Sequence, residues 1–140
     1  MEWLGWSLLS AVFAALTAIL AKKGVAHVDP NLATAIRTSV VMVMVWAIAL
    51  AVGRAHTIRT LEGRDWWFLA ASGVATGLSW LCYFRALALG PVSKVAPLDK
   101  LSVVFVLILA WPLLGERLTW TKGCGGLLLT AGAIVLALAK

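Results

Sequence analysis

The sequence predicts an all-α membrane protein that crosses the bilayer five times, and two observations lead to that prediction. Of its 140 residues, 62% are hydrophobic and 13% are charged, and the mean hydropathy is +0.97. A soluble globule needs more polar surface than this composition supplies. The hydrophobic residues also gather into five runs of about 19 to 23 residues, each long enough to cross a hydrocarbon core roughly 30 Å thick.

The five predicted spans follow one another with short connections. The first run lacks the basic start and the small-residue cleavage site of a signal peptide, so we expect it to be retained as a span. Glycine, proline and charged residues occupy the gaps, and such short connections predict that neighbouring spans run antiparallel. We therefore expect one transmembrane domain over residues 1–140. Its spans are approximately 3–21, 32–53, 66–86, 92–114 and 119–139.

Lysine and arginine residues in the loops normally decide how a membrane protein inserts. An odd number of spans puts the two chain ends on opposite sides, and the basic loop residues then divide equally between the sides unless Arg37 is counted with them. This balance predicts insertion in both orientations, which would permit an antiparallel homodimer. On the amino-terminal side lie Arg54, Arg59, Arg64, Arg117 and Lys122, and on the other side Lys22, Lys23, Arg85, Lys94 and Lys140.

Charged residues inside the predicted spans are the main candidates for a functional site. A charge at bilayer depth costs about 2.5 to 3.5 kcal/mol on insertion scales, so a chain that carries such residues is expected to use them. Arg37 lies about five residues into the second span and Asp99 about seven into the fourth, which places each roughly 8 to 11 Å deep. Both spans begin on the same side, so an ion pair between Arg37 and Asp99 is feasible if the two helices adjoin.

Lys100 and Pro97 accompany Asp99 in the fourth span. Successive helical residues point about 100° apart, so we expect Lys100 to diverge from Asp99 and to need another acceptor or water. Pro97 removes the backbone donor to the Ser93 carbonyl and is expected to loosen the helix, which is tolerated where backbone lines a watery cavity. The structural alternative is a buried ion pair that only fixes helix register, with Lys100 extended toward the headgroups.

Trp80 and Tyr83 lie one helical turn apart in the third predicted span. Their spacing would allow both rings to stack on a planar substrate, which would make them binding residues. The simpler interpretation is that they pack against neighbouring helices. The sequence leaves both alternatives open and favours packing.

Signatures of an enzyme, a metal site or a nucleic-acid interface are absent from the sequence. His27 and His56 lie in predicted loops without a nearby cluster of cysteines or carboxylates at metal-ligand spacing. There is no phosphate-binding glycine loop and no nucleophile elbow. The net charge of +6 comes from basic residues between apolar runs, which is typical of membrane-protein loops. We therefore expect no catalysis, no cofactor, no metal and no nucleic-acid partner.

Four stretches of the chain carry a family resemblance. They are NLATAIRT at 31–38, SWLCYFRAL at 79–87, GPVSKVAPLDKLSVV at 90–104 and LGERLTW at 114–120. On these stretches the whole chain resembles the drug/metabolite transporter superfamily, specifically one EamA-type unit, and the third stretch resembles the small five-span branch from bacteria and archaea. The resemblance implies a half-transporter of five helices in the inner (plasma) membrane.

Most EamA-type proteins carry two such units, inverted relative to each other, in one chain of ten spans. The resemblance therefore implies that a single unit works as an antiparallel homodimer, which would restore the inverted repeat around a cavity near the bilayer midplane. It also implies secondary transport of a small metabolite, usually outward, by alternating access. Related four-span exporters exchange protons through a carboxylate in the first span, and the absence of Asp and Glu from residues 3–21 disfavours that scheme here.

The charges inside the spans suggest the type of substrate. Arg37 and Lys100 outnumber Asp99 by one positive charge per protomer, an imbalance that an anionic or zwitterionic solute would relieve. Two alternative functions remain: a non-transporting small membrane subunit of a larger complex, and a flippase for lipid-linked sugars. The candidate substrate-binding residues are Arg37, Asp99, Lys100, Trp80 and Tyr83, with Pro97 as the helix break.

Overall fold

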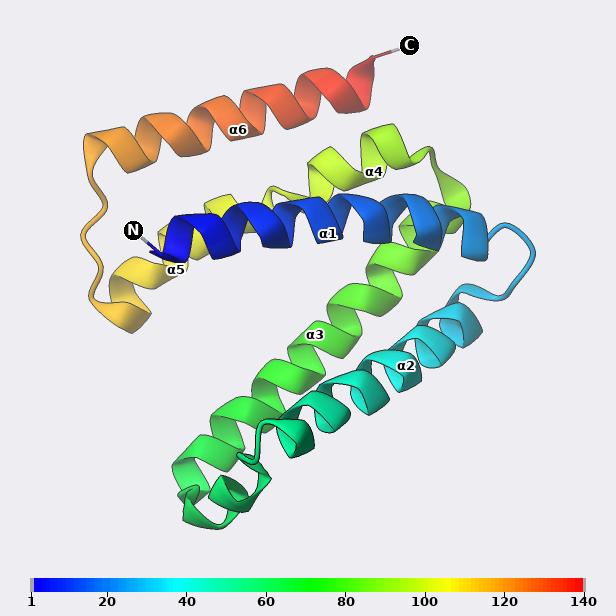
Figure 1. Cartoon of the computed structure of the whole chain (residues 1–140). Helices are drawn as coiled ribbons and strands as arrows, with labels where there is room; N and C mark the ends of the chain where they lie inside the picture. Colours follow the sequence, from blue (N-terminus) through cyan, green and yellow to red (C-terminus); the bar gives the residue numbers. More distant parts are fainter. Residues whose placement is uncertain (1, 140) are drawn as a thin grey trace. The chain divides into compact units, whose positions relative to one another are not determined.

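The computed structural model describes residues 2–139, and Lys140, counted above among the loop charges, lies outside them. The described residues form helices joined by short turns (Figure 1), as the all-α prediction requires. The helices are α1 (Glu2–Gly24), α2 (Pro30–Ala51), the 3₁₀ helix η1 (Ala55–Thr60), α3 (Gly63–Leu89), α4 (Val92–Asp99), α5 (Ser102–Leu114) and α6 (Trp120–Leu138).

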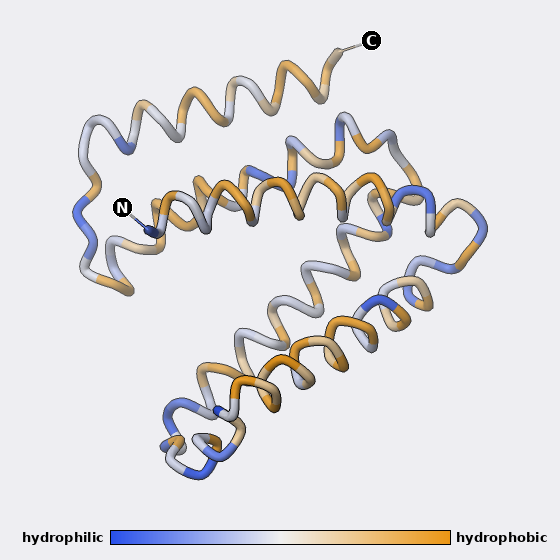
Figure 2. The backbone as a smooth tube through the Cα atoms, viewed as in Figure 1, coloured by the Kyte–Doolittle hydropathy of each residue, from blue (hydrophilic) through white to orange (hydrophobic). Residues whose placement is uncertain are grey.

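Within residues 2–139, five stretches of helix are long and apolar enough to cross a membrane, which confirms the predicted number of spans. The spans of α1, α2, α3 and α6 are single helices. The remaining span, Val92–Leu114, combines α4 and α5. Polar residues gather mainly at helix ends and in the turns, whereas the helix middles are largely apolar (Figure 2). The short helix η1 lies in the connection between α2 and α3, where hydropathy alone does not reveal it.

Capping contacts set where several helices begin and end. The Asp29 carboxylate accepts hydrogen bonds from the backbone N–H groups of Asn31 and Leu32 at 2.9 and 3.1 Å, so it caps the start of α2. The turns after α2 and α5 contain glycines in the left-handed conformation, Gly53 with φ of +72° and Gly115 with φ of +69°. Glycine reaches these angles without the steric penalty of a Cβ atom, so both turns depend on it.

The helices group into two compact units, which we describe separately. Residues 21–88 form one unit, with the end of α1, all of α2 and most of α3. The described parts of 1–20 and 89–140 form the other, in which α6 packs against α4 and α5. Gly126 of α6 is buried there, and a Cβ atom added to it would lie 3.3 Å from Leu107 Cδ1 of α5. A small residue at this position lets the two helices approach closely.

Little of the apolar helix surface is buried within the protein. Only 6 to 11% of each apolar span window is covered. Most large hydrophobic side chains are exposed. In a bilayer such surfaces contact acyl chains or other helices. The described chain therefore offers extensive apolar surface to lipid or to a partner.

Candidate functional site

Arg37 lies in the 21–88 unit, seven residues after the first residue of α2 and therefore about 10 Å along that helix. It shares a helix face with Thr34, because residues three apart lie on the same side of a helix. Thr34 is buried, and its hydroxyl donates to the Pro30 carbonyl at 2.8 Å. This polar face is therefore covered by protein near the start of α2, and Arg37 extends from it toward α3.

Two aromatic rings of α3 receive the Arg37 guanidinium. Its Cζ atom lies 4.2 Å from the centroid of the Trp80 ring and 5.5 Å from that of Phe84. Trp80 and Phe84 are four residues apart on α3, so their rings lie on one helix face. Both distances are within the roughly 6 Å range of a cation–π interaction, which strengthens when water is excluded. The contact therefore couples α2 to α3 through a charged residue.

Tyr83 lies beside this arrangement and interacts electrostatically with Arg37. Its ring meets that of Phe84 edge to face, with centroids 6.5 Å apart and an interplanar angle of 66°. This geometry is favourable for two aromatic rings. Tyr83 therefore supports Phe84, which is 2% exposed. The sequence did not point to Phe84 as a site residue, although its spacing from Trp80 was visible.

A second cation lies in the same unit. The Lys22 side chain, at the end of α1, donates a hydrogen bond from Nζ to the Leu87 carbonyl near the end of α3. A lysine at this position satisfies a carbonyl that the helix end leaves free and complements the negative end of the helix dipole. Leu87 itself is fully buried. The contact therefore joins the end of α1 to the end of α3, close in sequence to Phe84.

Asp99 and Lys100 lie where the fourth span is interrupted. α4 ends at Asp99, and α5 begins only at Ser102. Lys100 Nζ lies 3.5 Å from Asp99 Oδ2, so the two residues form an ion pair. The expectation that Lys100 would diverge from Asp99 was wrong, because Lys100 lies in the turn and not in a continuous helix. The Lys100 side chain is 57% exposed and that of Asp99 is 38% exposed.

The backbone explains how the helix breaks after Pro97. The Lys100 and Leu101 N–H groups donate to carbonyls three residues back, at 3.1 and 3.0 Å, and Val103 does the same to Lys100 at 3.0 Å. A regular α-helix would instead use carbonyls four residues back. Proline has no N–H to give to Ser93. The Ser93, Ala96 and Asp99 carbonyls therefore lose the donors that an uninterrupted helix would supply, as the loosening predicted from Pro97 requires.

The predicted pair of Arg37 and Asp99 stays a prediction, because the two residues belong to different compact units. Within its own unit Arg37 contacts aromatic rings, and Asp99 pairs locally with Lys100. Asp99 lies seven residues after the first residue of α4, as Arg37 does in α2.

Across residues 2–139, no group of three His, Cys, Asp or Glu residues is placed to hold a metal ion.

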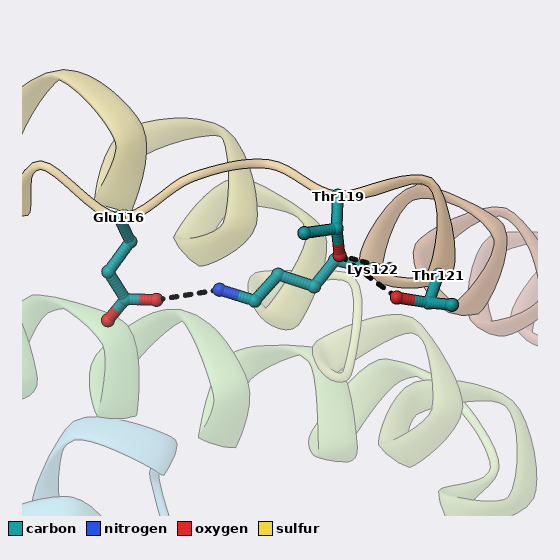
Figure 3. A network of polar contacts seen from close by, with 4 residues as sticks. All are labelled: Glu116, Thr119, Thr121 and Lys122. Carbon is teal, nitrogen blue, oxygen red and sulfur yellow. Dashed lines mark hydrogen bonds and ion pairs between the residues drawn. The ribbon is translucent and has the colours of Figure 1, made fainter.

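The turn between α5 and α6 shows what the LGERLTW stretch does (Figure 3). Lys122 Nζ pairs with Glu116 Oε2 at 3.0 Å across this turn. The Thr119 hydroxyl accepts from the Lys122 N–H at 3.3 Å and so caps the start of α6. Gly115 supplies the left-handed conformation that ends α5. This stretch therefore has a structural role, which is to fix the connection between two helices.

The fold and these sites define a multi-pass membrane protein with ionic side chains set inside its apolar spans. The chain belongs to the EamA-like transporter family, which matches residues 1–138. It is therefore a membrane transporter, and membership implies a lipid bilayer around it and a small molecule as its cargo. This finding confirms the resemblance that the four sequence stretches indicated.

A curated relative supports the same assignment. The chain is 51% identical over 136 residues to a protein of Sinorhizobium sp named "Uncharacterized transporter in cobO 3'region". The matched region covers 97% of this chain and 96% of the relative, so the two proteins have nearly the same length. No solved structure matches the chain.

Proposed function

We propose that this chain is a secondary transporter that exports a small anionic or zwitterionic metabolite by alternating access. It acts as one domain over residues 1–140, in an antiparallel homodimer in the inner membrane. Arg37, Asp99 and Lys100 contact the substrate, Trp80 and Tyr83 contribute aromatic surface, and the break after Pro97 opens the fourth span.

The interruption of the fourth span at Asp99 and Lys100 is the observation that carries this proposal. The break lies about 10 Å along the span. Charged side chains and irregular backbone at such depth are tolerated where they line a water-filled cavity or are covered by other protein. Both side chains are partly exposed, so they need polar surroundings beyond those of the protomer. A solvated vestibule between two copies would provide them.

The excess of positive charge supports the substrate class. Arg37 and Lys100 together outnumber Asp99 by one charge. Two opposed copies would place two excess positive charges in one cavity. A carboxylate or phosphate group on the solute would compensate for them.

Three observations support the assembly of two copies. The described residues contain five candidate spans, which correspond to one unit of the family, and the Sinorhizobium relative has nearly the same length. The loop charges are balanced between the two sides, which favours dual insertion. Little of each span is covered within the chain, so a partner has surface to bind. An inverted repeat formed by two chains has the same architecture as one formed within a chain.

A second candidate is a non-transporting subunit that stabilises a larger membrane complex. The stacking of Arg37 on Trp80 favours it, because such a contact can fix the register of two helices without binding any solute. The two functions differ in whether the purified protein moves a solute by itself.

Uptake into proteoliposomes of purified protein tests the proposal. We expect uptake of members of an anionic or zwitterionic panel, namely phosphate, acetate, succinate and glycine, above that of empty liposomes. Choline and tetraethylammonium serve as cationic comparisons, and transport of cations alone would refute the substrate class. A protein that moves none of these solutes and purifies only with a larger complex would favour the subunit function.

A further inference from the structure

The Arg37 guanidinium lies over the rings of Trp80 and Phe84, which bear on how it can bind a ligand. We propose that Trp80 and Phe84 are positioning residues that present the N–H edge of Arg37 to a carboxylate or phosphate group of the substrate. This inference rests on the proposed function and names the chemical group that Arg37 recognises within it.

The aromatic contacts define one orientation for Arg37. Its Cζ atom lies 4.2 Å from the Trp80 centroid and 5.5 Å from the Phe84 centroid, so rings from successive turns of α3 lie against it. Phe84 is 2% exposed and packs edge to face with Tyr83, which restricts its movement. A long side chain held against rings on a packed helix loses less conformational freedom when it binds a ligand.

The contacts leave the hydrogen-bonding edge of Arg37 available. A guanidinium is planar, and its five N–H donors lie in that plane and not above it. In the proposed arrangement the rings lie against the face of the guanidinium and use none of these donors. Within residues 21–88, the ring contacts of this guanidinium are with Trp80 and Phe84, and Tyr83 interacts with it electrostatically. An oxyanion with two oxygen atoms could therefore bind side-on through two parallel hydrogen bonds.

Lysine cannot reproduce this geometry, which separates the inference from a simple need for charge. A lysine ammonium carries the same charge, but it lacks the planar fork and cannot bind a carboxylate through two parallel N–H groups. It also stacks poorly on the Trp80 face. If Arg37 only balanced charge or fixed helix register through its cation, Arg37→Lys would be tolerated.

The chain contains a matched control at the other end of α3. Arg64 Cζ lies 5.7 Å from the Phe68 centroid, so this pair has the same chemistry. It lies in the first two turns of α3, near the end of the span, and Phe68 is 60% exposed. Replacing residues of this pair alters an arginine–aromatic contact without altering the contact of Arg37.

The test measures binding of inorganic phosphate and acetate to the purified full-length protein in nanodiscs by saturation-transfer and ³¹P NMR. We expect Arg37→Lys, Trp80→Leu and Phe84→Leu each to raise the dissociation constant about tenfold, which corresponds to about 1.4 kcal/mol. Trp80→Phe keeps an aromatic face and should stay within about threefold of the unmodified protein. Arg64→Lys and Phe68→Leu should leave binding unchanged. Circular dichroism and size-exclusion chromatography identify variants that fail to fold.

Several results would overturn the inference. They are failure of both probes to bind, full binding by Arg37→Lys, and equal losses in Trp80→Phe and Trp80→Leu. Nanodiscs of zwitterionic lipid compared with nanodiscs of anionic lipid separate a free solute from a lipid headgroup. Loss of phosphate binding in anionic nanodiscs would mean that the N–H groups of Arg37 bind a lipid headgroup and not a free solute. That result would also overturn the inference.

The same variants separate this inference from the proposed function. If Arg37→Lys transports as well as the unmodified protein, transport stands and the role of the Arg37 edge fails. If phosphate or acetate binds as expected but no solute of the panel enters proteoliposomes, the role of Arg37 in binding oxyanions stands and the transport function fails.

Discussion

Neutralising Asp99 and Lys100, separately and together, distinguishes a pair that acts in transport from one that only stabilises the break. Their charged atoms are 3.5 Å apart, and the side chains are 38% and 57% exposed, respectively. An ion pair with this exposure contributes at most about 1 kcal/mol. Since 1.4 kcal/mol corresponds to a tenfold change, losing the pair alone should change a transport rate by no more than about fivefold.

We expect a larger loss, because both side chains are proposed to contact the solute. Asp99→Asn and Lys100→Gln should each lower the initial rate of uptake by about thirtyfold or more, with the thermal unfolding midpoint changed by only a few degrees. The double variant should be as inactive as either single variant. The assay is the initial rate of labelled solute entry into proteoliposomes, normalised to the amount of correctly folded protein.

The turn between α5 and α6 provides the control pair. Lys122 and Glu116 are 3.0 Å apart with side chains 40% and 55% exposed, which closely resembles the exposure of the Asp99 pair. Glu116→Gln and Lys122→Gln should leave the uptake rate within about twofold. Recovery of the uptake rate in the Asp99→Asn/Lys100→Gln variant would refute the reasoning, because a purely structural pair can be replaced by neutral groups with little loss.

Three further changes test the backbone features on which the site depends. Pro97→Ala restores the N–H that can bond to the Ser93 carbonyl. It should therefore raise thermal stability, slow hydrogen exchange over residues 97–101 and lower the rate of transport. Faster exchange over these residues would contradict the proposed cause of the break. Gly115→Ala should cost about 1 kcal/mol of stability in denaturant unfolding because of its positive φ, whereas Gly63→Ala, in open space on α3, should be neutral or slightly stabilising. Thr119→Ala removes the cap of α6 and should cost about 1 kcal/mol in the same measurement; an unchanged midpoint would mean that the 3.3 Å contact has no energetic role.

The positions of the helices could be predicted from the sequence because each span must satisfy one strong constraint, the thickness of the bilayer. The predicted runs and the observed helices differ mainly at their ends. α3, for example, extends to Leu89 where the predicted span ended at residue 86. Hydropathy does not register such ends, which depend on local caps such as the Asp29 carboxylate at the start of α2.

The break in the fourth span was only partly predictable. Pro97 indicated that a donor would be missing, but the helix continues through Pro97 and ends two residues later. Where a helix ends after a proline depends on how the next N–H groups find acceptors, and here they bond three residues back. The ion pair of neighbouring residues Asp99 and Lys100 follows from that turn, so helical geometry gave the wrong expectation for Lys100.

The aromatic contacts of Arg37 were not predicted, because a charge inside a span points first to a partner of opposite charge. Counting back from the end of α3, Phe84 and Trp80 lie about 8 and 14 Å along that helix, on either side of the roughly 10 Å depth of Arg37 in α2. The two helices are consecutive and antiparallel, so this match was available. Both ring faces and carboxylates attract a guanidinium. Depth in the membrane alone therefore could not decide whether Arg37 contacts the aromatic rings or Asp99.

The proposed transport cavity requires two copies of the chain inserted in opposite directions. Labelling of a cysteine or a reporter fused after the carboxyl terminus, in cells and with membrane-impermeant reagents, measures the orientation of every copy. We expect comparable labelling from both sides of the membrane, and a shift toward one side when basic residues are added to one set of loops. Labelling from a single side in the unmodified protein would contradict the antiparallel homodimer and the transport cavity built on it.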